Sequence, residues 1–238
     1  MRAPLAQVMT QLEAQTHRRF IKSHVPLDGL SLYEDIKYIH VARDGRDACM
    51  SFHNHQLAFT DAALATFDRI GMEDETIARP FPRASPDPQV FFREWVTKGP
   101  NFSSLDFFDF EKSYWSERQR ANLLLVHYND LKSDLAGEMR RIAGFLDIRV
   151  PDSLWPELVG AADFDSMRRD GEQLIPRAGE TFQGGASRFL FKGTNGRWTD
   201  VLNADDLAMY AAKVDACFPP ACARWVEGGR HGGEPRST

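Results

Sequence analysis

The fold of this 238-residue chain is decided by two consecutive stretches, Ile36-Lys37-Tyr38-Ile39-His40-Val41-Ala42 and Arg43-Asp44-Gly45-Arg46-Asp47-Ala48-Cys49-Met50-Ser51. The first is rich in β-branched and aromatic residues, which predicts a strand over 36–42. The second opens a helical pattern that predicts a helix from about Asp44 to Ala65. A strand that leads into a helix is a unit of parallel sheets, and a basic element at that junction is typical of a phosphate site.

Outward from this unit, strands and helices continue to alternate. This predicts an α/β domain with a parallel sheet covered by helices on both sides. No repeat or linker divides the chain, so we expect a single domain over residues 1–227 and a disordered tail, rich in Gly, Arg and Pro, over 228–238. The expected helices cover 4–15, 91–96, 117–120, 131–146, 152–169 and 203–217 (with Asn203 as N-cap), the expected strands 19–24 and 122–127, and the expected loops 79–90 and 170–200.

The composition excludes several classes of partner. A net charge of −5 argues against nucleic-acid or anionic-membrane binding, although local lysines and arginines can still bind an anion. Three cysteines make no disulfide framework, which favours a reducing, cytoplasmic setting. No signal peptide is visible, and the longest apolar run, 123–126, is too short to span a bilayer.

A second basic element lies far downstream, in Phe191-Lys192-Gly193-Thr194-Asn195-Gly196-Arg197-Trp198. Glycines let backbone N–H groups approach an anion closely, and Lys192 adds a mobile charge. Arg43, where a strand ends, and Ser51, eight residues later, can reach one phosphate. Taken singly, each element has a commoner explanation: a surface turn, or Arg43 paired with Asp44 or Asp47. Together they suggest a nucleotide site assembled by folding.

Four other residues are candidates for chemistry. Lys22 and His24 share one face of the expected strand, where His24 can accept a proton and Lys22 can stabilise negative charge. Tyr128, after the strand 122–127, is placed to touch a base or ribose, and Phe164 offers a stacking face. The alternatives are a solvated lysine, a histidine that caps a turn, and two core aromatics.

Other clusters lack the spacing that their chemistry needs. His53 and His55 point away from each other on a helix, and Cys217 and Cys222 lack two further zinc ligands, so no metal is expected. No Ser-His-Asp or Gly-x-Ser-x-Gly arrangement is present. A kinase is disfavoured because no Gly-Lys-Ser/Thr element occurs.

In this order, the elements resemble the sulfotransferase family, which transfers a sulfuryl group from 3′-phosphoadenosine-5′-phosphosulfate to a hydroxyl or amine. The resemblance predicts a P-loop NTPase-like α/β architecture. The matching segments are 19–27 (the strand with the catalytic His), 43–51 (the 3′-phosphate motif), 91–95 (the segment before the acceptor loop), 126–131 (the Tyr-Glu-Asp-Leu strand end) and 191–198 (the Arg-Lys-Gly-x-x-Gly-x-Trp loop).

The resemblance implies a role for each matched residue. His24 would deprotonate the acceptor, and Lys22 would steady the sulfuryl group. Arg43, Ser51, Lys192 and the Gly193 amide would bind the 3′-phosphate, Tyr128 and Phe164 would contact adenine, and Phe91, Trp95, Phe102 and Phe107 would help to line an apolar acceptor pocket. The partner would be a small molecule with a hydroxyl or amine, and a homodimer is one candidate assembly.

The sequence departs from the family pattern at three places. Phe191 stands where the family has arginine, and Thr199 where it has a later lysine, so positive charge is lost. The family's opening strand and Pro-Lys-Ser-Gly-Thr-Thr loop do not occur before His24 or elsewhere in these residues. We therefore interpret the domain as N-terminally truncated, with a poorly filled sheet or an unpaired edge. The alternative function is a non-catalytic or weakly active remnant that keeps only the 3′-phosphate half-site.

Overall fold

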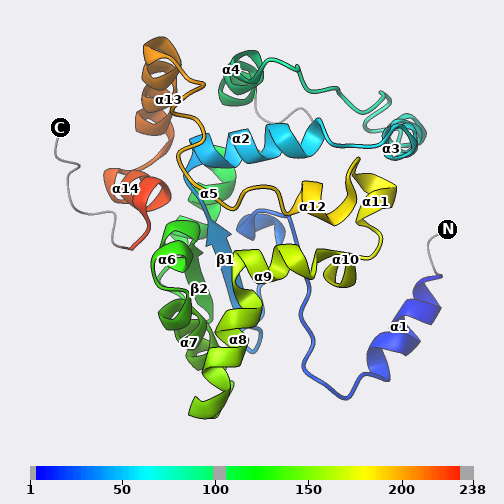
Figure 1. The fold of residues 1–238 in the computed structure, drawn as a ribbon, viewed down its shortest axis with the longest axis vertical. Coiled ribbons are helices and arrows are strands. Elements are labelled where there is room, and N and C mark those ends of the chain that lie inside the picture. Colours follow the sequence, from blue (N-terminus) through cyan, green and yellow to red (C-terminus); the bar gives the residue numbers. More distant parts are fainter. Residues whose placement is uncertain (1–3, 99–105, 231–238) are drawn as a thin grey trace.

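The computed structural model describes residues 4–98 and 106–230 (Figure 1). Its sheet, in the described part of the chain, consists of two parallel strands, β1 (Tyr38–Ala42) and β2 (Leu123–His127). Tyr38 is opposite Leu123, and this register continues to Ala42 opposite His127. The predicted strands over 36–42 and 122–127 are confirmed, so the α/β class and the parallel pairing follow from the sequence.

The helices surround this pair of strands in Figure 1, while α1 lies apart from the main body and buries none of its residues. The helical elements are α1 (Leu5–Glu13), η1 (Leu27–Gly29), α2 (Gly45–Gln56), α3 (Asp61–Glu73), α4 (Pro88–Lys98), α5 (Phe107–Ser116), α6 (Tyr128–Ser133), α7 (Leu135–Phe145), η2 (Asp152–Leu154), α8 (Trp155–Ala162), α9 (Phe164–Arg169), α10 (Gly171–Leu174), α11 (Ala178–Thr181), α12 (Gly185–Phe189), α13 (Ala204–Cys217) and α14 (Pro220–Gly228).

The two faces of β1 differ in burial. His40 and Ala42 point into the protein, whereas Ile39 and Val41 are 38% and 57% exposed. The alternation follows from the two-residue period of a strand. One side of β1 is therefore uncovered in the described structure.

Two apolar clusters hold the helices together. The larger joins α2, α4, α5, α13 and α14 around Phe92, Phe108 and Tyr210, all of them fully buried. The smaller packs Phe59 against Phe182, with ring centres 5.6 Å apart, and connects the end of α2 to α11 and α12. This second cluster fixes the segment that leads into the 191–198 loop.

The predicted helix Asp44–Ala65 is interrupted, which is a correction. The backbone of 58–60 pairs instead with residues 181–183: Thr60 donates its N–H to the Thr181 carbonyl at 2.9 Å, and Gln183 donates to Ala58 at 2.7 Å. Thr60 then caps α3 by accepting the Ala63 N–H at 3.1 Å. Tertiary pairing with a distant segment thus overrides local helix propensity.

The predicted strand over 19–24 is wrong, because these residues have no regular secondary structure and are exposed. In the region 131–146, two helices replace the expected one, with Asp134 capping α7 by accepting the Gly137 N–H at 2.8 Å. The aromatic stretch before 117–120 forms α5, and the expected loop 170–200 contains α10, α11 and α12.

Both ends of the last predicted helix are confirmed. Asn203 caps α13 within a reciprocal capping box with Asp206, and the helix ends at Cys217. A further helix, α14, follows to Gly228, and Arg230 donates its N–H to Asp130 at 3.0 Å. The first residues of the expected tail are therefore held by the fold, and 231–238 lie outside the described residues.

Candidate functional site

The carboxyl ends of the two strands bring the first site residues together. Arg43 follows β1 and Tyr128 follows β2, and the register of the strands places them side by side. The Arg43 guanidinium carbon lies 4.4 Å from the centre of the Tyr128 ring. Ligands of open α/β sheets bind outside this edge, so the position suits a ligand site.

A cavity of about 160 Å³ opens at this edge. It is smaller than the roughly 300–1,000 Å³ typical of pockets that enclose a drug-sized ligand, so its size suits part of a nucleotide. All of the nucleotide-binding residues expected from the sequence line it, namely Arg43, Ser51, Tyr128, Phe164, Lys192 and Gly193. The fold thus gathers into one hollow residues that are far apart in the chain.

Arg43 connects this cavity to the 191–198 loop. Its Nη2 donates to the Thr194 carbonyl at 2.8 Å and to Asn195 Oδ1 at 3.0 Å. Its Nε is buried without a hydrogen-bond partner among the described residues. The alternative that Arg43 pairs with Asp44 or Asp47 does not hold among the described ion pairs. Asp44 pairs with Arg46, and Asp47 accepts backbone N–H groups of the 191–198 loop.

Asp47 holds the same loop, a role that the sequence did not single out. Its buried carboxylate accepts the Gly196 N–H at 2.9 Å and the Arg197 N–H at 3.1 Å. Such an aspartate in a first helical turn is ordinarily explained by the helix dipole, so no sequence signal separates the two roles.

Gly193 is required by the shape of the loop. Its φ is +62°, and a Cβ there would lie 2.5 Å from the Phe164 ring. Phe164 therefore packs directly against the loop backbone. Gly196 also has a positive φ, +76°, but a Cβ there would meet no atom within 4 Å.

The cavity also contains residues that the sequence prediction missed. Asn54 and His55 reach it from α2, Arg188 precedes the 191–198 loop, and Arg197 belongs to that loop. Burial, with smaller contributions from the charges of Lys22 and His24, lowers the pKa of His55. Phe191 stands where the family pattern has an arginine. Arg188 and Arg197 bring positive charge to the same part of the cavity.

Lys22 and His24 are not among the lining residues of the cavity. Both are exposed in the segment that precedes Pro26. The positive charges of Lys22 and His24 contribute to the lowered pKa of His55, which lines the cavity. Neither residue is held on a strand.

The expected apolar acceptor lining is partly corrected. Phe91 and Trp95 are buried in the main core, 4% and 6% exposed, and Phe107 packs against it. These rings therefore stabilise the fold rather than line the cavity. Phe102 lies outside the described residues.

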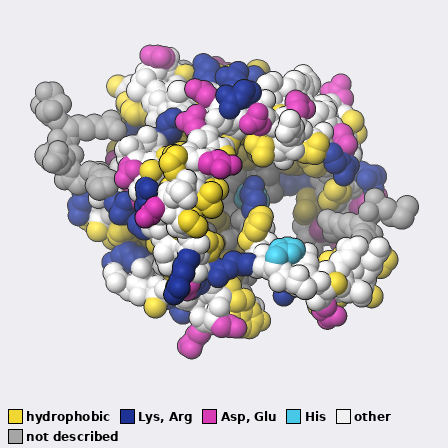
Figure 2. All heavy atoms as spheres, turned by 60° about the horizontal axis from the view of Figure 1, so that its bottom comes forward, with side chains coloured by type: hydrophobic (Ala, Val, Ile, Leu, Met, Phe, Trp, Pro, Cys, Tyr) yellow, Lys and Arg dark blue, Asp and Glu magenta, His cyan; other side chains and the backbone are white. Residues whose placement is uncertain are grey.

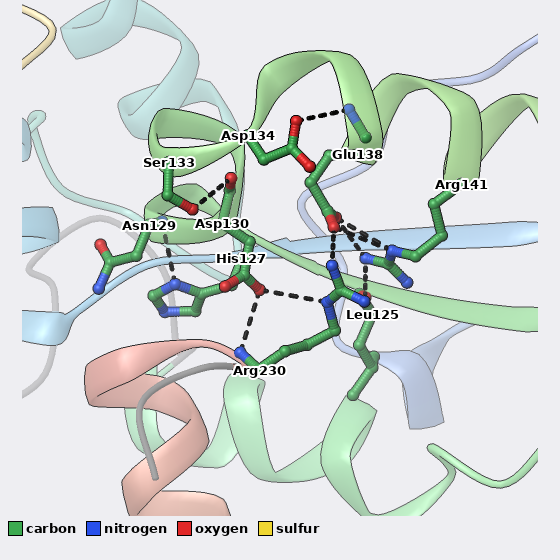
Figure 3. Close-up of polar contacts among 10 residues, drawn as sticks. Leu125, His127, Asn129, Asp130, Ser133, Asp134, Glu138, Arg141 and Arg230 are labelled. Atoms are coloured by element: carbon green, nitrogen blue, oxygen red, sulfur yellow. Dashed lines mark hydrogen bonds and ion pairs between the residues drawn. The ribbon is translucent and has the colours of Figure 1, made fainter. Parts of the chain in front are cut away.

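His127, the residue before Tyr128, caps the start of α6 (Figure 3). Its Nδ1 accepts the Asn129 N–H at 3.1 Å, which caps α6, and its Nε2 lies 2.9 Å from the Val226 carbonyl. The ring must be neutral, with its proton on Nε2, to make both bonds. Burial lowers the pKa of His127, which favours this neutral form.

A buried network of ion pairs and hydrogen bonds joins α6 and α7 to the residues that follow α14. Glu138, 1% exposed, accepts from Arg141 at 2.6 Å and from Arg230. Arg230 also donates its backbone N–H to Asp130 (Figure 3). The network thereby connects the end of α14 to the helices that follow β2.

The surface around these elements carries both signs of charge. On the face shown in Figure 2, Lys and Arg side chains and hydrophobic side chains surround a hollow, with Asp and Glu interspersed. Among residues 4–98 and 106–230, no three His, Cys, Asp or Glu side chains gather as a metal site. No helix in this part of the chain is long and apolar enough to cross a bilayer.

The profile of the sulfotransferase domain matches residues 2–218, and the chain belongs to the sulfotransferase family. It is 30% identical over 98% of its length to a glycolipid sulfotransferase of Mycobacterium bovis, of which it covers 76%. The glycolipid sulfotransferase of Mycobacterium tuberculosis gives the same identity and coverage.

Solved structures show the same fold. Retinol dehydratase in complex with androsterone and the inactive cofactor PAP matches with a TM-score of 0.67 at 22% identity, over 89% of this chain. The chain spans 57% of the retinol dehydratase chain. Mouse sulfotransferase SULT7A1 in complex with PAP matches with a TM-score of 0.69 at 16% identity, over 91% of this chain and 72% of that one.

Proposed function

We propose that the protein transfers a sulfuryl group from 3′-phosphoadenosine-5′-phosphosulfate to an acceptor hydroxyl or amine. The observation that carries this proposal is the single cavity lined by Arg43, Ser51, Tyr128, Phe164, Lys192 and Gly193. Residues from distant segments converge there, which supports a site for a nucleotide with a phosphate on its ribose. Membership of the sulfotransferase family supports sulfuryl transfer as the reaction.

In this proposal, each group acts on a defined part of the donor. Arg43, Ser51, Lys192 and the Gly193 N–H bind the 3′-phosphate through charge-assisted hydrogen bonds. Tyr128 and Phe164 contact the adenine, whose flat faces suit aromatic side chains. The proposal requires the phosphosulfate end of the donor to reach Lys22 and His24.

The reaction is an in-line displacement at sulfur. His24 accepts the proton of the acceptor, whose oxygen or nitrogen forms the new bond to sulfur, while the bond from sulfur to the 5′-phosphate oxygen breaks. Lys22 stabilises the charge on the sulfuryl oxygens, as preorganised cations do in related group transfers. Adenosine 3′,5′-bisphosphate then leaves as the second product.

The first acceptor to test is a glycolipid, because the relatives that match nearly the whole chain carry that name. A sugar hydroxyl supplies the nucleophile that the reaction needs. Three free cysteines favour a reducing compartment, and we propose the cytoplasm.

A second function is favoured by the position of His24. The residue is exposed and outside regular secondary structure, so its geometry is weakly fixed. A nucleotide-binding protein with little or no transfer activity would have the cavity and lack a positioned base. Both candidate functions predict nucleotide binding, but only the first predicts transfer of the sulfuryl group.

The test combines binding with transfer. Calorimetry should show that the protein binds adenosine 3′,5′-bisphosphate, with Arg43→Met and Ser51→Ala each weakening binding by about tenfold, the value of a charge-assisted hydrogen bond. With labelled donor and a glycolipid or phenol, His24→Ala should abolish transfer while its nucleotide affinity is unchanged.

Each outcome separates the candidates. Binding without transfer in the wild type would favour the nucleotide-binding remnant. Equal turnover in His24→Ala would refute the assignment of the base, and unchanged affinity in both Arg43→Met and Ser51→Ala would remove these two residues from the site.

A further inference from the structure

Three cations surround the ring of Phe191. The guanidinium carbons of Arg188 and Arg197 lie 5.1 and 5.0 Å from its centre, and Lys192 Nζ lies 5.4 Å away. At such distances the π-face of the ring attracts each cation and orients it. Phe191 and all three cations line the cavity described above.

The chain path explains this gathering. Arg188 belongs to the last turn of α12, three residues before Phe191. The positive φ angles of Gly193 and Gly196 then turn the chain back, so that Arg197 returns to the same ring. Asp47 fixes the return by accepting the backbone N–H of Arg197.

The positive charge at this point is not balanced within the described structure. No ion pair among the described residues involves Arg43, Arg188, Lys192 or Arg197 with a carboxylate. Asp47 is the nearby acid, and its oxygens accept backbone N–H groups.

The pKa of Arg197 is lowered, mainly because the side chain is buried. The positive charges of Arg43 and Arg188 lower this pKa further, whereas the negative charge of Asp47 raises it. Cationic side chains that repel one another gain most when an anion binds between them. Arg43 Nε, buried without a partner, is a further donor in this cavity.

We propose that Arg188 and Arg197, held against Phe191, bind the phosphate group on the ribose of the nucleotide together with Arg43. The proposal rests on the proposed function and adds two binding residues to which the sequence assigned no role, Arg188 before the 191–198 loop and Arg197 within it. A phosphate monoester suits the site because it carries close to two negative charges and three acceptor oxygens, and guanidinium groups bind it through paired N–H donors.

The experiment compares two nucleotides that differ in the ribose phosphate. Calorimetry measures the affinity of adenosine 3′,5′-bisphosphate and of adenosine 5′-monophosphate for the wild type, Arg188→Met, Arg197→Met and the double variant. Methionine keeps an apolar stem against Phe191 and removes the charge. Arg177→Met is the matched control, because Arg177 is exposed, pairs with Glu180 and does not line the cavity.

Each single variant should weaken bisphosphate binding by about tenfold and monophosphate binding by less than about twofold, since one charge-assisted hydrogen bond corresponds to that range. Arg197→Lys should recover part of the loss. The dependence of bisphosphate affinity on salt should also fall in the double variant. Arg177→Met should bind both nucleotides as the wild type does.

Two results would overturn the proposal, and they are distinguishable. If the double variant binds the bisphosphate like the wild type while Arg43→Met binds it weakly, the nucleotide site stands and these two arginines do not belong to it. An equal loss for both nucleotides would assign the arginines to another part of the ligand. If the wild type binds neither nucleotide, the proposed function itself fails.

Discussion

Gly193 is the residue at which the loop and the aromatic platform meet. Replacing it with alanine forces a left-handed backbone on a residue with a Cβ, which costs about 1–2 kcal/mol. The new methyl group would also overlap the Phe164 ring, which lies 2.5 Å from the Cβ position. We expect Gly193→Ala to lower the affinity for adenosine 3′,5′-bisphosphate by more than about tenfold.

Gly196→Ala is the control for this prediction. It imposes the same kind of backbone strain, but its Cβ meets open space. Urea denaturation should therefore show a loss of stability in both variants, larger for Gly193→Ala because of its overlap with Phe164, while calorimetry shows a small affinity loss for Gly196→Ala. Equal affinity losses would mean that strain in the loop, and not the contact with Phe164, controls binding.

At this scale, the sequence located Arg43, Ser51, Lys192 and Gly193 because their motifs are local. It did not indicate Arg188 or Asp47. Their positions depend on how two glycine turns and the end of α12 place the loop in space. The spacing of residues along the sequence does not show that the loop folds back toward α12.

The junction of β2 and α6 is an element whose stability should depend on pH. The pKa of His127 is lowered in the folded protein, because burial disfavours its charged form. The unfolded chain therefore binds a proton more readily, with a pKa of about 6.5. Stability is then fully present above this value and falls as pH decreases below it.

We expect the unfolding free energy of the wild type to decrease as the pH is lowered from 7 to 5.5. His127 should contribute up to about 1 kcal/mol of this loss. His127→Asn keeps an oxygen that can cap α6 and does not titrate, so its stability should fall less steeply. Urea denaturation at several pH values measures both. Identical slopes in the two proteins would contradict this role of His127, and His55→Asn tests the second histidine with a lowered pKa.

Among the elements, β1, β2 and α13 were predictable, because the secondary structure that each local sequence favours is also the one that the rest of the fold stabilises. The stretch 19–24 has a strand-like composition but no neighbouring strand to pair with among the described residues, so propensity alone did not suffice. The end of α2 could not be predicted from the local sequence either, because it results from backbone pairing with residues 181–183.

On the scale of the whole molecule, Arg230 joins the C-terminal helix to the strand–helix layer. Arg230→Met leaves buried Glu138 with Arg141 as its remaining described partner. We expect this variant to lose about 1–3 kcal/mol of stability in urea, the range for a buried charged group that loses one partner. The control Arg224→Met removes an exposed charge from the same helix and should change little.

A double-mutant cycle with Glu138→Gln tests whether the loss comes from this pair. The coupling free energy between Arg230 and Glu138 should be about 1 kcal/mol or more, because they are in direct contact. Additive effects would show that the loss comes from the other ion pair of the Arg230 side chain, with Asp130 Oδ2 at 3.7 Å, because the variant keeps the backbone N–H that binds Asp130.

The anchoring of the 191–198 loop by Asp47 and Arg43 has a thermodynamic consequence. A tethered segment gives up its conformational entropy when the chain folds, so this penalty is already met before any ligand arrives. Binding of the proposed nucleotide would then need little ordering of the backbone, and its free energy would come from the contacts themselves.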